Sequence, residues 1–371
     1  MRERIQAGHI GWQATRLSSR WVGWAAAAMI LAALGITWTV FSGIGVRFWS
    51  GLVGLSALFA LPIALAPDRY RKYAFILPAS VILFGLAFVP VVFVLVISLT
   101  DSGLGVLRGK FRFIGLTNFV SLLAEDADAR NAMVRTIAYV VVTVMVETVL
   151  ALNLALLIHR KTRASNTVTT MLLVPMMSTP IVIALIWRTL FAFDDGLLNR
   201  LLTTLGIQGV PWLSGVALPI LGDLAGKSSA MLGLTHGFLS AEIVDIWQWT
   251  PFLILIFLAG LKTVPQDLYE AGEIDGGSGW QLFWHITLPQ IASVMAIGVA
   301  LRVVDAFKTF ETIWALFGNT AHYRTLSVDI FSRAIETGRF GEASAESVLL
   351  LVISMLIGFG VLAWSRGETG T

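Results

Sequence analysis

The chain has 371 residues, of which 56% are hydrophobic and only 13% are charged, and its mean hydropathy is +0.80. Soluble domains carry about 25% charged residues, so this composition excludes a soluble protein and indicates a polytopic membrane protein. The net charge of +3 does not point to nucleic acid, because the basic residues are spread over short segments and form no cluster. The sequence has no cysteine, which excludes disulfides, zinc–thiolate sites and cysteine nucleophiles.

The first apolar run, Trp24–Phe41, follows four arginines, a pattern similar to that of a secretory signal peptide. No convincing cleavage site of small residues follows, and a second apolar run begins at Phe48. We therefore expect both runs to be retained as helices. Residues 1–72 would form a cytoplasmic N-terminus with two accessory transmembrane helices, and residues 73–371 the main transmembrane domain.

The sequence predicts an all-α fold with about eight transmembrane helices. Helices are expected because an open strand edge leaves backbone groups unpaired in lipid. The apolar runs that approach the length needed to cross about 30 Å of hydrocarbon are Trp24–Phe41, Phe48–Ala66, Phe75–Leu99, Ile137–Ile158, Met171–Phe193, Ile243–Leu261, Ala292–Phe317 and Val348–Trp364.

The orientation follows from the basic residues, which are densest in the segments between alternate runs, notably Arg69–Lys72 and Arg160–Arg163. Because Lys and Arg concentrate in short cytoplasmic segments, both termini are predicted to be cytoplasmic. The outer segments would then be Thr100–Arg135, Asp194–Glu242 and Gly318–Ser347. The segment Leu268–Pro289 would lie in the cytoplasm.

This polar segment, LYEAGEIDGGSGWQLFWHITLP, is patterned as a helix–turn–helix on the membrane surface. Leu268–Asp275 is predicted to be a short helix, and Gly276, Gly277 and Gly279 then break it. Trp280–Leu288 resumes an amphipathic pattern, and Pro289 suits the first turn of the next membrane helix.

The spacing of this segment resembles the cytoplasmic loop of ABC importer permeases, in which Glu-Ala-Ala, then Gly, then Ile-x-Leu-Pro recur. The matching residues here are Glu270, Ala271, Gly272, Asp275, Gly276, Ile286, Leu288 and Pro289. The chain departs at Gly272, where the family usually has Ala. The flanking sequence is similar to the carbohydrate-type branch, close to the maltose-type permeases, and the resemblance covers roughly residues 70–365.

The resemblance implies a type I ABC importer permease fold, here with two extra N-terminal helices, and a coupling loop at residues 262–289. It implies four kinds of contact: a second permease subunit, two cytoplasmic ATPase subunits that bind the ATP, an extracytoplasmic solute-binding protein, and the bilayer. No cofactor and no nucleic acid are expected on this chain. The host would be a prokaryote, with the protein in its inner or plasma membrane.

Charged residues inside apolar runs are costly and tend to face a cavity or a partner helix. Asp305 with Lys308, and Lys308 with Glu311, can pair along one face of a helix, or the three can line the solute path. The other charged residues of this kind are Glu147, Arg188, Asp245 and Arg302. Arg188 and Asp245 lie near the predicted outer ends, where a charged group can reach the interface.

Sugars are held by aromatic faces and hydrogen-bonding groups, which makes Trp187, Trp247, Gln248 and Asn153 candidates for the solute path. A tryptophan near a helix end can equally be an interfacial anchor. The five histidines show no metal-ligand spacing, so no metal site is expected. Gly222–Ser228 resembles a phosphate loop but has three residues between its glycines instead of four, so no ATPase site is expected here.

These features favour the permease subunit of an ATP-driven importer for a sugar or related polyol. The alternative is a secondary active transporter of small polar solutes, which would require repeat-related broken helices and ion-coupling residues at mid-membrane. A membrane-embedded enzyme would require a catalytic constellation that we do not find. The sequence does not identify the solute.

Overall fold

The computed structural model describes residue 87 and residues 90–103, 112–159, 165–219 and 232–368. The first two expected helices, Trp24–Phe41 and Phe48–Ala66, and most of Phe75–Leu99 lie outside the described residues. So does the segment Gly222–Ser228. The described part of the chain divides into two compact units, one reaching to Gly115 and including Arg339–Gly341, the other containing the remaining residues.

The smaller unit contains a helix over residues 90–98 and a short strand pair. Strand β1 (Thr100–Asp101) pairs antiparallel with β2 (Arg112–Phe113), so that Thr100 lies opposite Phe113. The Thr100 hydroxyl donates to the Ser102 hydroxyl at 3.0 Å. An all-α prediction missed this pair, because two residues per strand give no periodic signal.

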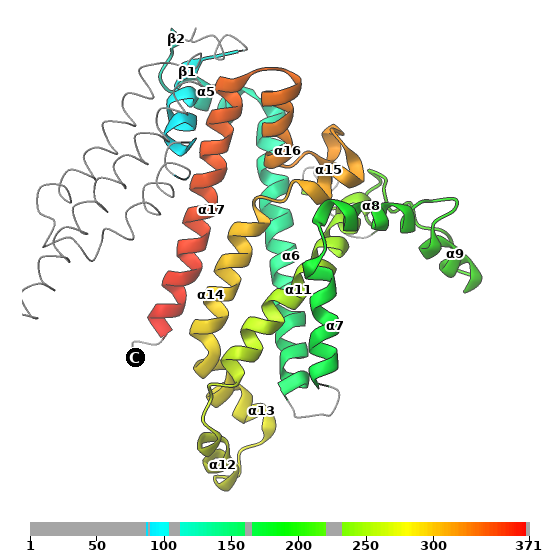
Figure 1. Ribbon diagram of the computed structural model, residues 1–371, viewed down its shortest axis with the longest axis vertical. Coiled ribbons are helices and arrows are strands. Elements are labelled where there is room, and N and C mark those ends of the chain that lie inside the picture. Colours follow the sequence, from blue (N-terminus) through cyan, green and yellow to red (C-terminus); the bar gives the residue numbers. More distant parts are fainter. Residues whose placement is uncertain (1–86, 88–89, 104–111, 160–164, 220–231, 369–371) are drawn as a thin grey trace, which may run out of the picture. The chain divides into compact units, whose positions relative to one another are not determined.

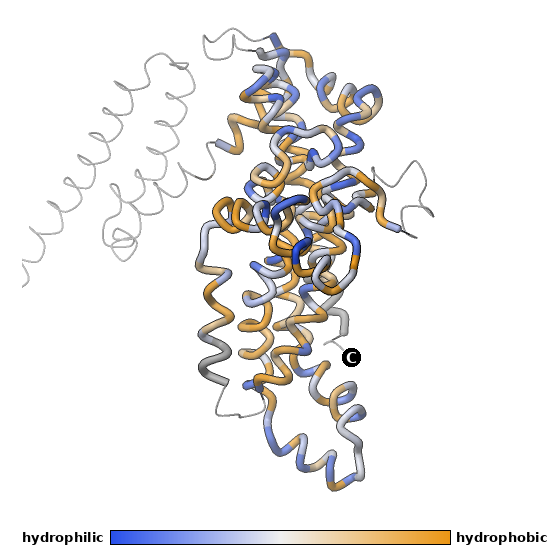
Figure 2. The backbone as a smooth tube through the Cα atoms, turned by 90° about the vertical axis from the view of Figure 1, so that its right-hand side faces the viewer, coloured by the Kyte–Doolittle hydropathy of each residue, from blue (hydrophilic) through white to orange (hydrophobic). Residues whose placement is uncertain are grey.

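The larger unit is a bundle of long helices, drawn in Figure 1. They are α6 (Ala127–His159), α11 (His236–Leu261), α14 (Leu288–Ala306) and α17 (Phe340–Glu368). Within the described residues, four helical segments are long and apolar enough to cross a membrane, or five if one bent pair is a single span. In Figure 2 the long helices of this unit are drawn mostly in orange, the colour of hydrophobic residues.

The shorter elements cap and connect these helices. They are α5 (Thr117–Val120), η3 (Ser121–Glu125), α7 (Ser165–Met177), α8 (Pro180–Leu190), α9 (Leu197–Thr204), α12 (Gln266–Ile274), α13 (Gly279–Leu282), η5 (Phe283–Thr287), α15 (Glu311–Phe317), η6 (Ala321–Tyr323), α16 (Leu326–Phe331) and η7 (Ser332–Glu336). Of these, η3, η5 and η7 are π-helical and η6 is a 3₁₀ turn.

The predicted run Met171–Phe193 is not one straight helix. Helices α7 and α8 meet at a bend of 97° between Met177 and Pro180. The residue before a proline is pushed out of the helical region, and Thr179 has ψ 127° immediately before Pro180. The sequence contained this proline, but the apolar composition continues across it and concealed the break.

The prediction of one helix over Ala292–Phe317 is wrong. Helix α14 ends at Ala306, and α15 begins only at Glu311. No glycine or proline lies between them. The break accompanies tertiary packing: Phe307 is buried in a cluster with Val140 and Val144 of α6, and the ring of Phe310 stacks on Trp314.

The core between α6 and α11 is built on small residues. Ala151 and Ala155 of α6 are fully buried against a cluster that contains Leu253, Ile254 and Phe257 of α11. Small side chains let two helix backbones approach closely, and van der Waals packing is the main attraction between helices in lipid. This contact holds the two helices that carry two of the buried acidic groups described below.

Candidate functional site

The hairpin predicted from Leu268–Pro289 is present, and the helix–turn–helix expectation is confirmed. Helix α12 is followed by a turn, then by α13 and η5, which lead without interruption into α14. In Figure 1 the hairpin projects beyond the ends of α11 and α14, on the opposite side of the unit from α16. None of the residues of α12 is buried.

The turn of the hairpin is specified by two capping motifs. Gly276 has φ 79°; its N–H donates to the Glu273 carbonyl at 3.0 Å, and the Gly277 N–H donates to the Gly272 carbonyl at 2.9 Å. This pair of bonds is a Schellman C-cap, which favours glycine at the left-handed position. On the other side, Ser278 and Gln281 form a capping box at the start of α13.

Gly272 allows α12 to lie close against the second half of the hairpin. A Cβ atom built there would lie 2.5 Å from Cδ2 of Leu282 and 3.1 Å from Cδ1 of Ile286. The Tyr269 hydroxyl also lies 3.0 Å from the Thr287 hydroxyl. The departure from Ala at position 272 therefore coincides with a close helix contact in this chain.

The remaining motif residues divide between an exposed and a packed set. Glu270, Ala271 and Asp275 are exposed, whereas Ile286 is half-buried and packs toward Gly272. Leu288 is half-buried, and Pro289 lies in the first turn of α14, where its missing N–H costs no helical hydrogen bond. The exposed acidic surface of α12 is therefore free to meet another molecule.

The three charged residues expected on one helix stripe are not on one helix. Asp305 lies in the last turn of α14, Lys308 in the turn that follows, and Glu311 at the first position of α15. Asp305 lies 3.7 Å from the Arg302 guanidinium. Within the described residues, Lys308 makes no ion pair with Asp305 or Glu311, so pairing along one helix face, one of the two roles left open for these charges, is not present. All three side chains are exposed.

The polar and aromatic candidates have separate surroundings. Trp187 of α8 and Trp247 of α11 meet edge to face, with ring centroids 5.8 Å apart, and Trp247 is 43% exposed. The Asn153 side chain is exposed and donates to the Val149 carbonyl of its own helix. Gln248 is fully buried. The structure therefore brings Trp187 and Trp247 together, but not with Asn153.

Gln248 supports the bend between α7 and α8. Its side-chain Nε2 donates to the Ser178 carbonyl at 3.2 Å, in the break between those two helices. A carbonyl freed by a helix break needs a replacement donor in lipid, and Gln248 supplies it. Its Oε1 atom is buried without a hydrogen-bond partner among the described residues.

The most buried charges form one group between α6, α11 and α14. Arg302 donates from Nε to Glu147 at 2.7 Å and from Nη2 to the other oxygen of Glu147 at 2.9 Å. Nη2 also contacts the carboxylate of Asp245. All three side chains are at most 1% exposed, and the ring of Trp249 lies 5.6 Å from the guanidinium carbon.

This group corrects one expectation and refines another. Asp245 does not reach the interface but is buried beside Arg302. Arg188 is exposed, yet it donates to the Ala315 carbonyl of α15 at 3.2 Å. Glu147, Asp245 and Arg302 pair from one helix to another. This is one of the two roles left open for the intramembrane charges. The sequence identified the three charges, but no spacing rule links residues from three separate helices.

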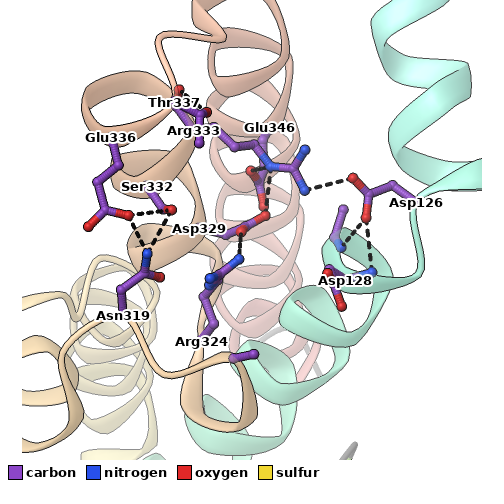
Figure 3. A network of polar contacts seen from close by, with 12 residues as sticks. Asp126, Asp128, Asn319, Arg324, Asp329, Ser332, Arg333, Glu336, Thr337 and Glu346 are labelled. Carbon is purple, nitrogen blue, oxygen red and sulfur yellow. Dashed lines mark hydrogen bonds and ion pairs between the residues drawn. The ribbon is translucent and has the colours of Figure 1, made fainter.

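A second group, drawn in Figure 3, lies where α6 and α17 begin. The guanidinium of Arg333 is 2.8 Å from Asp126, 2.8 Å from Asp329 and 2.9 Å from Glu342, with Glu346 at 3.2 Å. Asp329 also pairs with Arg324 at 3.1 Å. Arg333 thus ties the start of α6, the α16–η7 segment and the start of α17 together. Sequence reasoning missed this group, because its members come from separate elements that lie far apart in the chain, from Asp126 to Glu346.

Within this second group, the electrostatics favour the charged forms of Asp126 and Arg333. Burial alone would raise the pKa of Asp126, but hydrogen bonds from the Ala129 N–H and from Arg333 outweigh it and lower the pKa below its usual value. Burial alone would lower the pKa of Arg333, but the charge of Asp329 and the hydrogen bonds to Asp329 and Asp126 raise the pKa above its usual value.

Within the described residues, no three His, Asp or Glu side chains are grouped to hold a metal.

Comparison with known proteins gives one family and a set of relatives. Residues 147–366 match the family described as "Binding-protein-dependent transport system inner membrane component". A probable ABC transporter permease of Sinorhizobium fredii is 32% identical over 76% of this chain and 86% of that protein. The trehalose/maltose transport system permease MalF of Thermococcus litoralis is 32% identical over 65% of this chain and 76% of that protein.

Two further comparisons extend along most of the chain. The trehalose transport system permease SugA of Mycobacterium tuberculosis is 28% identical over 82% of this chain and 91% of that protein. Among solved structures, a chain of a bacterial alginate ABC transporter, in complex with an alginate pentasaccharide-bound periplasmic protein, superposes with a TM-score of 0.67. That match has 20% identity and covers 83% of this chain and 98% of the other, which establishes a common fold.

Proposed function

Because this chain belongs to the family of binding-protein-dependent transport system inner membrane components, we propose that it is the permease subunit of an ATP-driven importer for a sugar or related polyol. In this proposal the chain forms part of the translocation path. It receives the energy of ATP hydrolysis from a separate ATPase through residues 262–289.

The observation that carries the coupling role is the hairpin itself. An exposed helix with the acidic residues Asp267, Glu270 and Glu273 projects from the bundle, and the Schellman turn and capping box fix its shape. Its second half runs into α14, which carries Arg302. A partner that moves α12 would therefore shift a membrane helix as a rigid body.

The solute class is proposed from the relatives. Two of them are named as permeases for trehalose or maltose, and a third as a xylose/arabinose import permease of Haloferax volcanii. The three exposed charges Asp305, Lys308 and Glu311 are proposed to border the path, since charged groups within an apolar membrane segment are rarely left toward lipid. The Trp187–Trp247 pair offers aromatic faces of the kind that sugars stack against.

The proposed assembly contains a second permease subunit, two ATPase subunits and an extracytoplasmic solute-binding protein. The alginate transporter was solved with a periplasmic protein bound, which supports the last of these. The hairpin and both termini are proposed to be cytoplasmic. Reporter fusions at Gly279 should then give an inside signal and fusions at Asp126 an outside signal; an outside signal at Gly279 would contradict the coupling role.

The decisive experiment is charge reversal on α12. Glu270→Lys should abolish sugar uptake and ATPase co-purification while the protein stays in the membrane, because an exposed residue contributes little to folding. The matched control is Asp194→Lys, which makes the same change at an exposed acidic residue outside the hairpin. Normal uptake by Glu270→Lys, or equal loss in both variants, would reject coupling through this loop. Uptake without any ATPase would favour a secondary transporter.

A further inference from the structure

Three aromatic side chains, two of them exposed and Phe283 half-buried, form a cluster on the second half of the hairpin. The ring centroid of Trp280 lies 5.9 Å from that of Phe283 and 5.6 Å from that of Trp284, and Phe283 and Trp284 are 5.4 Å apart. Trp280 is 70% exposed and Trp284 is 47% exposed. Within the proposed coupling segment 262–289, the contact with an ATPase was assigned to α12, and no contact was assigned to these rings.

Helix α12 leaves the two tryptophans of the cluster exposed, whereas Phe283 is half-buried. Helix α12 packs through Gly272 against Leu282 and Ile286, and through Tyr269 against Thr287. Leu282 and Ile286 are half-buried at this contact, whereas Trp280 and Trp284 remain exposed. A partner that grips α12 alone would leave the aromatic face uncovered.

The two halves of the hairpin also differ in charge. Helix α12 carries Asp267, Glu270 and Glu273, whereas residues 279–289 contain no Asp, Glu, Lys or Arg. An acidic surface suits a protein partner with basic groups. An uncharged surface of two tryptophans and one phenylalanine, with indole N–H groups that can still donate hydrogen bonds, suits the boundary between hydrocarbon and water.

The length of the helix places the cluster at that boundary. The continuous segment Gly279–Ala306 has 28 residues, which extend about 42 Å at 1.5 Å per residue. The hydrocarbon layer is about 30 Å thick, and the headgroup regions bring the bilayer to about 40–45 Å. Helix α14 alone has 19 residues, enough to fill the hydrocarbon. The residues before Leu288 therefore fall among the headgroups, where tryptophan is enriched.

We propose that Trp280, Phe283 and Trp284 form a membrane-anchoring face that binds the lipid headgroup region of the leaflet from which the hairpin projects. The anchor holds the second half of the hairpin at a fixed depth while α12 stays in water, available to a protein. The inference depends on α14 crossing the bilayer, and it does not depend on docking of an ATPase.

The test uses the absence of cysteine from the natural sequence. Single cysteines replace Trp280, Trp284 and, as the control, Ile274, which is an apolar residue of α12 that is 86% exposed. Each full-length variant is labelled with an environment-sensitive fluorophore. It is then reconstituted into phosphatidylethanolamine–phosphatidylglycerol vesicles whose acyl chains are brominated near the headgroup.

The proposal expects the bromolipids to quench most of the fluorescence at positions 280 and 284, and to leave position 274 unquenched but open to iodide from the water. Equal quenching at all three positions, or none at 280 and 284, would overturn it. The proposal would also be overturned if positions 280 and 284 became shielded from iodide only after the ATPase subunits were added. That result would assign the aromatic face to the ATPase.

Two additions keep the test decisive. If loss of either tryptophan prevents insertion, Gly279→Cys replaces it as the labelling site, because a Cβ atom there meets nothing within 4 Å and Gly279 adjoins Trp280. Sugar uptake by the same proteoliposomes, supplied with the partner subunits, is measured separately. A vesicle that shows bromolipid quenching without ATP-driven uptake would support the anchor and count against the proposed coupling, so the two ideas fail independently.

Discussion

Arg302 and Glu147 are 155 positions apart in the chain, yet two hydrogen bonds of 2.7 and 2.9 Å join their side chains in the interior of the bundle. The geometry is bidentate, which is the strongest arrangement of a guanidinium and a carboxylate. Asp245 contacts the same guanidinium from a third helix. One arginine thus fixes α6, α11 and α14 relative to each other.

Removing that arginine should be far more damaging than removing a charge at the edge of the group. Arg302→Met leaves two carboxylates buried without a counter-charge, and breaking a buried pair in this way costs roughly 3–5 kcal/mol. We expect little protein in the membrane and a much lower Tm in detergent. Asp305→Asn is the matched control, because that residue lies 3.7 Å from the guanidinium and is 50% exposed. Equal stability of the two variants would show that the buried contacts contribute little.

The turn of the hairpin offers a clean test of backbone conformation. Gly276→Ala places a side chain at φ 79°, although no atom lies within 4 Å of the new Cβ. The cost is therefore backbone strain alone, roughly 1–2 kcal/mol. Gly279→Ala adds the same methyl group into equally open space without the positive φ. We expect reduced ATP-driven uptake for the first variant and normal uptake for the second; identical uptake would mean that the turn geometry is not needed.

The charges at the end of α14 can be tested for contact with the solute. Asp305→Asn, Lys308→Gln and Glu311→Gln are each expected to leave membrane levels normal, because all three residues are exposed. If one borders the path, its variant should raise the KM for sugar uptake while ATPase activity with the binding protein is retained. Unchanged KM and selectivity in all three variants would remove these residues from the path.

The ion pair of Asp126 predicts a defined pH dependence. Because its pKa is lowered in the folded protein, its stabilising contribution is fully present above the pKa of the unfolded carboxyl, about 3.9. The contribution is lost as the pH falls from that value through the folded pKa. The difference in Tm between the natural protein and Asp126→Asn should therefore be constant near neutral pH and shrink toward zero in acid. A difference that persists in acid would point to the N–H contacts at the start of α6 and not to charge.

Apolar runs in the sequence located the membrane helices of the larger unit, but their ends were set by contacts that no run reveals. Helix α6 begins at Ala127 instead of Ile137. The additional polar residues at the start of α6 are stabilised by Asp126, which accepts hydrogen bonds from the N–H groups of Asp128 and Ala129 and from Arg333. Helix α11 begins at His236 instead of Ile243, with Thr235 as its N-cap. A polar helix end held by distant partners is invisible to a hydropathy pattern.

The hairpin was the most predictable part of the candidate site, because its signals are local. Three glycines and Pro289 lie within one short segment, and the capping box of Ser278 and Gln281 could also have been found from its spacing. The buried ion pairs were not predictable in the same way. Lys308 appeared to follow Asp305 on one helix face, but α14 ends at Ala306, so Lys308 lies beyond the helix. Asp305 lies beside Arg302 of the same helix instead.

The unbroken path from Gly279 to Ala306 has a mechanical consequence. It includes the π-helical segment Phe283–Thr287, through which the backbone stays helical. Trp280 and Arg302 therefore lie on the same helical segment, about 33 Å apart along its axis at 1.5 Å per residue. A sideways force on the hairpin would then tilt this segment and move the three-helix ion pair at Arg302.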